Sequence, residues 1–251
     1  SSEAISCYLK QQLPGYTFEQ VDSTNQLLKK MAVDGSEHLT LVAAEEQRAG
    51  RGRFGRAFYS PSRTGIYMSL LLRLPQQFSD ASMITIYTAV AVQRALYRLY
   101  KIDTQIKWVN DILYQNKKLC GILCEAISDF ESGQIEAVIV GIGLNVSTMV
   151  FPEELNDIAV SLPPLSVNRN ELIACIVNEL LELQNEDRDA VLAQYREKSV
   201  VLHRQITWMR NGMRCNGYVE TINDAGNLVV SSEGTSVILN SGEVSVKEAH
   251  A

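Results

Sequence analysis

The sequence lacks the features that mark membrane, secreted and nucleic-acid-binding proteins. No apolar stretch is long enough to span a bilayer, and no charged and then apolar signal peptide opens the chain. The 5 cysteines are odd in number and scattered, which fits a reducing cytoplasm better than a disulfide scaffold. The 23 Lys and Arg residues are outnumbered by 29 Asp and Glu, and the net charge of −6 argues against a general nucleic-acid binder. We therefore expect a cytoplasmic protein that binds neither membrane nor DNA.

The chain is also poor in the residues of common catalytic and metal centres. Its 3 histidines, His38, His203 and His250, do not stand in the order of a serine–histidine–acid triad. Cys120 and Cys124 are close in sequence, but no histidine or further cysteine nearby completes a zinc site. Neither a hydrolytic triad nor a zinc site is therefore predicted, and metal ligands stay unassigned.

The composition that is present is typical of a folded globular protein. With 46% hydrophobic and 21% charged residues, wholesale disorder is excluded. A length of 251 residues lies near the upper end for one domain, so we expect one large core with a small appendage.

Apolar periodicity and turn residues predict alternating helices and strands up to about residue 199. Helix starts are indicated at Ser23, followed by Gln26, and at Asn168, followed by Glu171. Asn116, which tolerates a positive φ, lies in the expected turn of a hairpin at residues 115–118. The expected helices cover residues 1–12, 23–34, 82–99, 168–183 and 191–195, and the expected strands cover residues 16–21, 39–44, 65–73, 105–108, 112–114, 119–125 and 135–143.

Beyond residue 199 the pattern changes to short strands separated by glycine-containing turns. Five short strands in about fifty residues predict a small SH3-like barrel. The fold class is therefore α+β: a mixed sheet with helices in residues 1–199, and a small β domain in residues 200–251. The expected strands cover residues 203–210, 213–222, 227–230, 237–240 and 244–247.

The most unusual segment is the arginine loop, which we define as Arg48–Arg56. It holds four arginines and three glycines in an acidic protein. Its glycines match G-x-G-x-x-G, but no helix opens after them and Pro61 follows, so a dinucleotide fold is not predicted. Guanidinium groups match phosphate and carboxylate oxygens, and glycines let the backbone approach a ligand. The loop predicts a site for a small anion, with a solvated flexible loop as the alternative.

Three further segments carry candidate site residues. Lys107 follows Ile106 on an expected strand. Alternation directs the Lys107 side chain to the face opposite that of Ile106, and an anionic ligand on that face would neutralise its charge. An edge strand with Lys107 in water is the alternative. Gly141–Asn145 ends an apolar strand with glycines that either admit a ligand or pack tightly. Asp22–Asn25 offers polar groups at a helix start, which ordinary capping also explains.

Five segments together resemble the biotin protein ligases in residue types, order and separations. The similarity is dense from Ser23 to Asn145, and the β-rich end resembles the small C-terminal domain of that family. The segments are Asp22–Asn25, Gln47 with Gly50–Arg56, Lys107–Asp111, Lys118–Leu123 and Gly141–Asn145.

The resemblance implies a class II synthetase-like catalytic fold and two half-reactions. Biotin and ATP would give biotinyl-5′-AMP and pyrophosphate, and a lysine of a biotin carboxyl carrier protein domain would then take the biotin. ATP with Mg²⁺ is implied as cofactor. Fixed cations suit this chemistry, because a carboxylate must attack an α-phosphate.

The resemblance also implies roles for individual residues. Lys107 would be the central catalytic lysine, and Arg53 would lie close to the acyl phosphate. The implied biotin-binding residues are Ser23, Thr24, Asn25, Gln47, Gly50, Arg51, Gly52, Arg53, Lys107, Gly121 and Gly143. The implied ATP-binding residues are Arg53, Arg56, Phe58, Lys107 and Asn145.

Three residues depart from the usual pattern of the family. Val109 stands where proline is more usual in the lysine segment. Phe58 replaces a tryptophan that stacks on adenine in some members, and a phenylalanine ring can still stack over less area. Phe54 removes one charge from the arginine loop.

Two alternative functions fit the same residues. A lipoate–protein ligase would share the fold and the adenylate chemistry, and a non-catalytic module could bind an anion or a partner without ATP turnover. Few residues precede Asp22, so we expect the ligase-only type without a DNA-binding domain, although a start at Ser1 without methionine also fits a trimmed chain. Pairing of strand edges in a homodimer is conceivable, with no interface located.

Overall fold

The fold was analysed in a computed structural model of the chain. The structure describes residues 1–73, 81–128 and 132–246. Of the sequence predictions, Lys247 at the end of the last strand and His250 lie outside the described residues.

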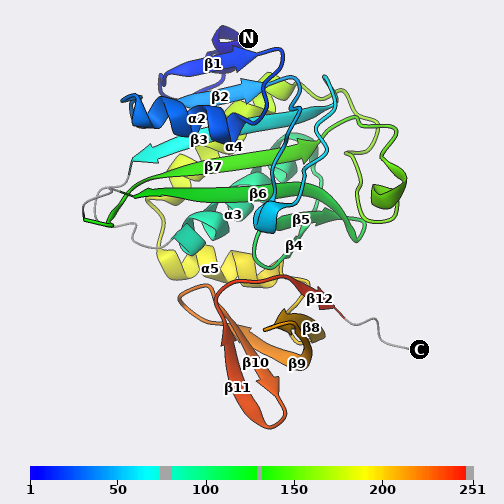
Figure 1. Cartoon of the computed structure of the whole chain (residues 1–251). Helices are drawn as coiled ribbons and strands as arrows, with labels where there is room; N and C mark the ends of the chain where they lie inside the picture. Colours follow the sequence, from blue (N-terminus) through cyan, green and yellow to red (C-terminus); the bar gives the residue numbers. More distant parts are fainter. Residues whose placement is uncertain (74–80, 129–131, 247–251) are drawn as a thin grey trace.

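A seven-stranded sheet forms the centre of the larger part of the molecule (Figure 1). The first two strands in the order below run parallel and every other neighbouring pair is antiparallel, which confirms the predicted mixed sheet. The spatial order is β1 (Gly15–Phe18), β2 (Leu41–Ala44), β3 (Gly65–Arg73), β7 (Ile135–Asn145), β6 (Lys117–Ser128), β5 (Asp111–Tyr114) and β4 (Gln105–Lys107).

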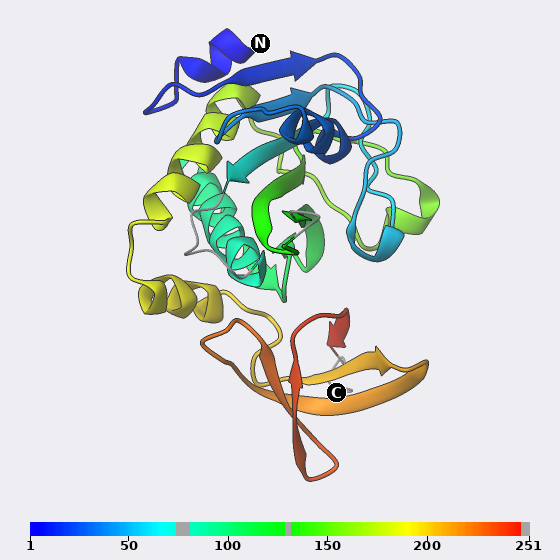
Figure 2. The ribbon, with the colours of Figure 1, turned by 60° about the vertical axis from the view of Figure 1, so that its left-hand side comes forward.

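Helices cover the two faces of this sheet unequally (Figure 2). The long helices α3 (Ala81–Tyr100) and α4 (Arg169–Leu183) pack on one face, and α5 (Arg188–Glu197) follows them towards the C-terminal sheet. Helix α2 (Thr24–Val33) contacts β2, β3 and β7. None of the helices in the described ranges combines the length and apolar character needed to cross a membrane.

Side-chain alternation along β7 explains this arrangement. Val138 and Val140 join the large core with α3 and α4, whereas Ala137 and Ile139 pack in a smaller cluster with α2. Gly141 continues the second series, beyond the apolar contact with α2. One face of the strand thus changes from apolar residues to glycine where the helix begins.

The predicted helix starts are confirmed. The Ser23 hydroxyl accepts from the Gln26 amide at 3.5 Å, and the Asn168 side chain accepts from the Glu171 amide at 3.3 Å. The cap at Ser23 holds the first two residues of α2, Thr24 and Asn25, directly above the sheet, where both are buried.

The predicted N-terminal helix is wrong beyond Ser6. Helix α1 covers only Ser2–Ser6, because the backbone after it bonds to α4 instead of continuing the helix. The Lys10 amide donates to Asn178 Oδ1 at 3.0 Å, and Asn178 Nδ2 donates to the Tyr8 carbonyl at 3.0 Å.

A second, antiparallel sheet follows α5, which confirms the α+β class and is consistent with the predicted SH3-like domain. Its order is β11 (Thr235–Leu239), β10 (Leu228–Ser232), β9 (Met213–Ile222), β8 (Gln205–Arg210) and β12 (Val244–Val246). Trp108 is buried, and its indole N–H donates to the Gly226 carbonyl at 2.9 Å, which ties the two sheets together. The division at residues 199 and 200 stays a proposal.

Candidate active site

A cavity lies over glycines of β6 and β7, at the N-terminal end of α2. Gly121 pairs with Gly143, and Gly141 lies two residues further along β7. A Cβ at Gly141 would meet Asn25 Oδ1 at 2.2 Å, and one at Gly143 would meet the Phe58 ring at 2.5 Å. Both positions require glycine because a polar side chain and an aromatic ring press directly on the backbone.

Part of the cavity is lined by neutral polar groups. The Thr24 amide and hydroxyl lie 2.9 and 3.1 Å from Gln47 Oε1. Gln47 Nε2 donates to Ser60 Oγ at 2.9 Å, so the orientation of the Gln47 amide is fixed at both ends. Thr24 and Gln47, both predicted from the sequence, therefore form one ordered unit.

Asn25 is held by a second set of hydrogen bonds. Its Nδ2 donates to the Leu123 carbonyl at 3.2 Å and to Glu125 Oε2 at 2.8 Å. Its Oδ1 lies 2.6 Å from the hydroxyl of Ser69, which is fully buried and also lies 2.8 Å from Thr24 Oγ1. Sequence reasoning missed Ser69 and Glu125, since neither belongs to a segment with an unusual pattern.

The cavity is also lined by cations, namely Arg51, Arg53 and Lys118. Arg53 Nη1 lies 3.3 Å from both Asn110 Oδ1 and the Gly242 carbonyl. Burial lowers the pKa of Arg53, opposed by nearby carboxylates, and a guanidinium nevertheless stays charged at neutral pH. The arginine loop therefore supplies a fixed positive charge to the cavity.

The strand connection around Val109 is held by buried contacts. Tyr195 donates its hydroxyl to the Val109 carbonyl at 3.0 Å, and burial raises the pKa of Tyr195 far above its usual range. Asn110 Nδ2 donates to the Ile122 carbonyl at 2.9 Å. These contacts order Asn110, whose side-chain oxygen accepts a hydrogen bond from Arg53. They do so although the preceding residue is Val109 and not proline.

Lys118, and not Lys107, is the lysine of the cavity. Lys118 Nζ lies 2.7 Å from Asp111 Oδ1, and its side chain lies against Gly121. Lys107 is not among the lining residues, although the strand register aligns it with Asp111, Gly121 and Gly143 on the same face of the sheet. Lys107 is half-buried.

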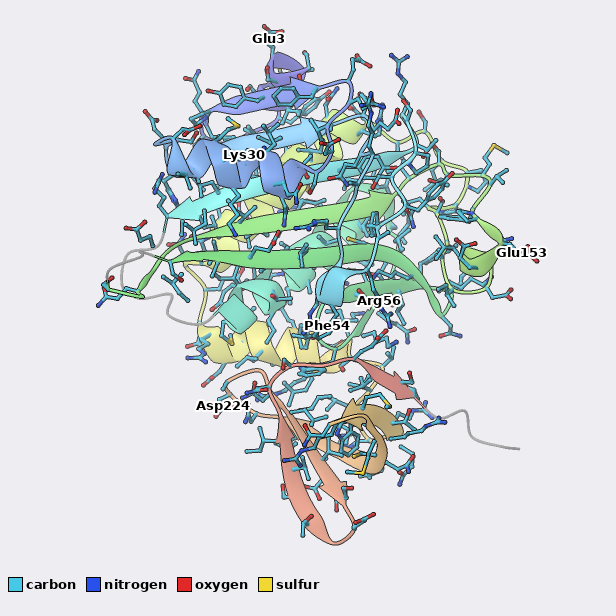
Figure 3. All side chains as sticks on the ribbon, viewed as in Figure 1. Glu3, Lys30, Phe54, Arg56, Glu153 and Asp224 are labelled. Carbon is cyan, nitrogen blue, oxygen red and sulfur yellow. The ribbon has the colours of Figure 1, made fainter. Side chains whose placement is uncertain are left out.

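Arg56, the predicted triphosphate-side arginine, turns to the C-terminal sheet instead of lining the cavity (Figure 3). Its Nη1 and Nη2 lie 2.6 and 2.5 Å from the two carboxylate oxygens of Glu243. Phe54, also labelled in Figure 3, is exposed, and the Arg53 guanidinium lies 4.9 Å from its ring centre. The Arg56–Glu243 ion pair and the contact of Arg53 with the Gly242 carbonyl thus hold the arginine loop towards the segment before β12.

Two other predicted residues do not line the cavity and have structural roles beside it. Gly50 is required by packing, because a Cβ there would meet the Phe58 carbonyl at 2.4 Å. Asn145 is buried, and its Nδ2 donates to the Val160 carbonyl at 3.2 Å. Asn145 Oδ1 has no hydrogen-bond partner within residues 1–73, 81–128 and 132–246.

The structure thus brings together most of the residues predicted for the site. The predicted residues that line the cavity are Ser23, Thr24, Asn25, Gln47, Arg51, Gly52, Arg53, Phe58, Gly121 and Gly143. Gly50, Arg56, Lys107 and Asn145 do not line it. Gly141, a glycine of the strand end predicted to admit a ligand, also lines it, and the lining residues without a predicted role are Met68, Asn110, Lys118, Ile122, Leu123 and Ile142.

The sequence left the metal ligands unassigned. In the described part of the chain, no group of three or more His, Cys, Asp or Glu side chains could hold a metal ion. All five cysteines are free thiols.

Fold and cavity together define a protein whose mixed sheet carries a cavity lined by glycines, neutral polar side chains and cations. The sequence profile of the Biotin/lipoate A/B protein ligase family matches residues 17–145, about half of the chain. The chain belongs to this family.

Individual proteins of known sequence or structure are similar over longer stretches. The bifunctional ligase/repressor BirA of Bacillus spizizenii is 38% identical over 67% of this chain, which spans only 52% of that protein. The biotin–[acetyl-CoA-carboxylase] ligase of Mycobacterium tuberculosis is 30% identical over 90% of this chain and 86% of that protein. The structure of biotin protein ligase from Aquifex aeolicus in complex with biotin and ATP superimposes with a TM-score of 0.80 at 26% identity, covering 95% of this chain and all of that one.

Proposed function

We propose that this protein is an ATP-dependent ligase that activates biotin as biotinyl-5′-AMP and transfers it to a lysine of a biotin carboxyl carrier protein domain. One observation carries the proposal: a single cavity is lined both by neutral donors and acceptors and by three cations. Its support is the family membership and the similarity to a ligase crystallised with biotin and ATP.

The neutral lining groups suit the ureido ring of biotin. That ring offers N–H donors and one carbonyl acceptor within a flat, uncharged group. Thr24 and Gln47 present hydroxyl and amide groups of fixed orientation, and the glycine floor allows a flat ring to approach the backbone. Ser23, Asn25, Gly121 and Gly143 line the same space.

The cationic lining groups suit activation of the carboxylate. In the first step a biotin carboxylate oxygen bonds to the α-phosphorus of ATP, and the bond to the bridging oxygen of pyrophosphate breaks. Arg51, Arg53 and Lys118 would offset the repulsion between the two anions and stabilise the charge that develops on phosphate. Lys118 takes the role that the sequence predicted for Lys107, because its ammonium group lies in the cavity.

In the second step the neutral amine of an acceptor lysine attacks the acyl carbon of the mixed anhydride. A biotin amide forms, AMP leaves, and the amine loses one proton. Phe58, whose ring lies against Gly143, would move to admit the nucleotide and would then stack on adenine. Closure of the arginine loop over the anhydride would exclude water from it.

The remaining expectations stay part of the proposal. Mg²⁺ would arrive with the phosphates of ATP, since the described side chains form no metal cluster. A cytoplasmic location agrees with the five free thiols. Absence of DNA binding and assembly as a homodimer rest on the sequence alone.

Biotin-dependent release of pyrophosphate from ATP tests the proposal, followed by transfer of labelled biotin to a carrier domain. We expect turnover with biotin and none with lipoate. Turnover with lipoate alone would identify a lipoate ligase, and absence of ATP turnover with either acid would favour a non-catalytic binding module.

A further inference from the structure

A carboxylate outside the cavity lining fixes the orientation of a buried amide inside it. Glu125 lies on β6, opposite Ile139 of β7, and accepts from Asn25 Nδ2 at 2.8 Å. The second proton of that amide goes to the Leu123 carbonyl. Both partners are acceptors only, so a flipped Asn25 would place its Oδ1 against two oxygens. Asn25 Oδ1 is therefore obliged to face Ser69.

The orientation of Asn25 decides the direction of the next hydrogen bonds. Ser69 Oγ lies 2.6 Å from Asn25 Oδ1, which has no proton, so the single Ser69 proton is donated to Asn25. The 2.8 Å contact between Ser69 and Thr24 is then a hydrogen bond only if Thr24 is the donor. Within the described part of the chain, the other acceptor at hydrogen-bond distance from the Thr24 hydroxyl is Gln47 Oε1, at 3.1 Å.

Either choice commits the Thr24 proton within the protein. The Thr24 hydroxyl can therefore offer only lone pairs to a molecule in the cavity. Gln47 cannot reverse this, because its Nε2 is bonded to Ser60 and its Oε1 already accepts from the Thr24 amide. A ligand that approaches Thr24 must bring an N–H or O–H donor.

We propose that Glu125, acting through Asn25 and Ser69, is a positioning residue that makes Thr24 an obligate hydrogen-bond acceptor, and so selects substrates with an N–H donor in the head group. This inference rests on the proposed function and gives a reason why the ligase would accept biotin and not lipoate. A ureido ring supplies such a donor, whereas the dithiolane ring of lipoate carries no N–H group.

Calorimetric titration of biotin into the full chain tests the role of Glu125. Glu125→Gln keeps the size of the side chain but lets it either accept or donate, so the Asn25 amide is no longer held one way. We expect the dissociation constant for biotin to rise about tenfold, with kcat and the ATP KM at saturating biotin unchanged. Glu136→Gln on the neighbouring strand β7 is the matched control, because Glu136 is exposed.

A double-variant cycle separates positioning from a merely structural role. Ser69→Ala removes the hydroxyl group that links Asn25 to Thr24. Adding Glu125→Gln to this variant should therefore cause almost no further loss of biotin affinity. Additive losses would overturn the inference, and so would unchanged biotin binding by Glu125→Gln. If that variant fails to fold, Ser69→Ala alone decides, since normal biotin binding by Ser69→Ala also overturns the inference. A wild-type protein that does not bind biotin would instead refute the proposed function.

Discussion

The two faces of the seven-stranded sheet share one backbone and carry opposite kinds of side chain. On β3, Leu70 points into the large core beneath α3 and α4, and its neighbour Ser69 points to the cavity network. On β7, Val140 packs in the core, and its neighbour Gly141 forms the cavity floor. Adjacent residues therefore serve stability and ligand binding separately, which strand alternation makes possible.

Helix α2 covers only part of the sheet face that carries the cavity. Beneath that helix, Ile139 and Ala137 pack against Leu28 in the smaller cluster. Beyond the N-terminus of the helix the floor consists of glycine, and polar side chains replace apolar ones. The start of α2 at its Ser23 cap thus sets where packing ends and the site begins.

The largest effect is expected from a cation at the cavity. Lys118→Ala should lower biotin-dependent pyrophosphate release by about 10²–10³, or about 3–4 kcal/mol, because one fixed charge at the reacting groups is lost. Lys117→Ala is the matched control on the adjacent position of β6, where the ammonium group donates to the Asn156 carbonyl. Lys107→Ala should have a smaller effect, and a larger loss from Lys107→Ala would contradict the assignment of Lys118.

Substitutions at the neighbouring residues Leu70 and Ser69 should act on different quantities. Leu70→Ala removes a fully buried side chain from the core and should lower the free energy of unfolding by about 2–5 kcal/mol, with the biotin dissociation constant unchanged. Ser69→Ala should weaken biotin and change stability less. Urea unfolding and biotin titration on both variants measure this, and equal loss of affinity in both would remove the distinction between the faces.

A smaller effect is expected where a methyl group enters the cavity floor. Gly141→Ala should weaken biotin about tenfold, since the new Cβ would lie 2.2 Å from Asn25 Oδ1 and must displace that amide. Gly15→Ala on β1 is the control, because its Cβ would make an ordinary contact of 3.5 Å with Ser2. Unaltered biotin binding by Gly141→Ala would show that Asn25 can move without loss.

Local patterns predicted much of the fold. The caps at Ser23 and Asn168, the apolar runs of β3 and β7 and the change to short strands after residue 199 all act over a few residues, and the structure confirms them. The helix predicted over residues 1–12 failed because bonds to Asn178, distant in sequence, replace those of a helix.

The choice of lysine shows why the site was harder to predict. The sequence placed Lys118 in the hairpin turn at residues 115–118. In the structure Gln115 and Asn116 both adopt positive φ, so the turn ends early and β6 begins at Lys117. Lys118 is then fixed on a strand beside Gly121, and it lines the cavity where Lys107 does not. Ser69 and Glu125 were missed because their roles depend on contacts between strands.

The smallest effect concerns a tyrosine on the cavity face that serves stability rather than ligand binding. Tyr67 is fully buried, its hydroxyl donates to the Pro61 carbonyl at 3.0 Å, and burial raises its pKa to about 12 from 10. The unfolded chain therefore releases this proton at lower pH than the folded chain, so the contribution to stability is complete below pH 10 and is lost as pH rises towards 12. By pH 11 the free energy of unfolding should fall by about 1.4 kcal/mol more in the wild type than in Tyr67→Phe. Urea unfolding at pH 8 and pH 11 measures the difference, and parallel losses in the two proteins would mean that ionisation of Tyr67 is not linked to folding.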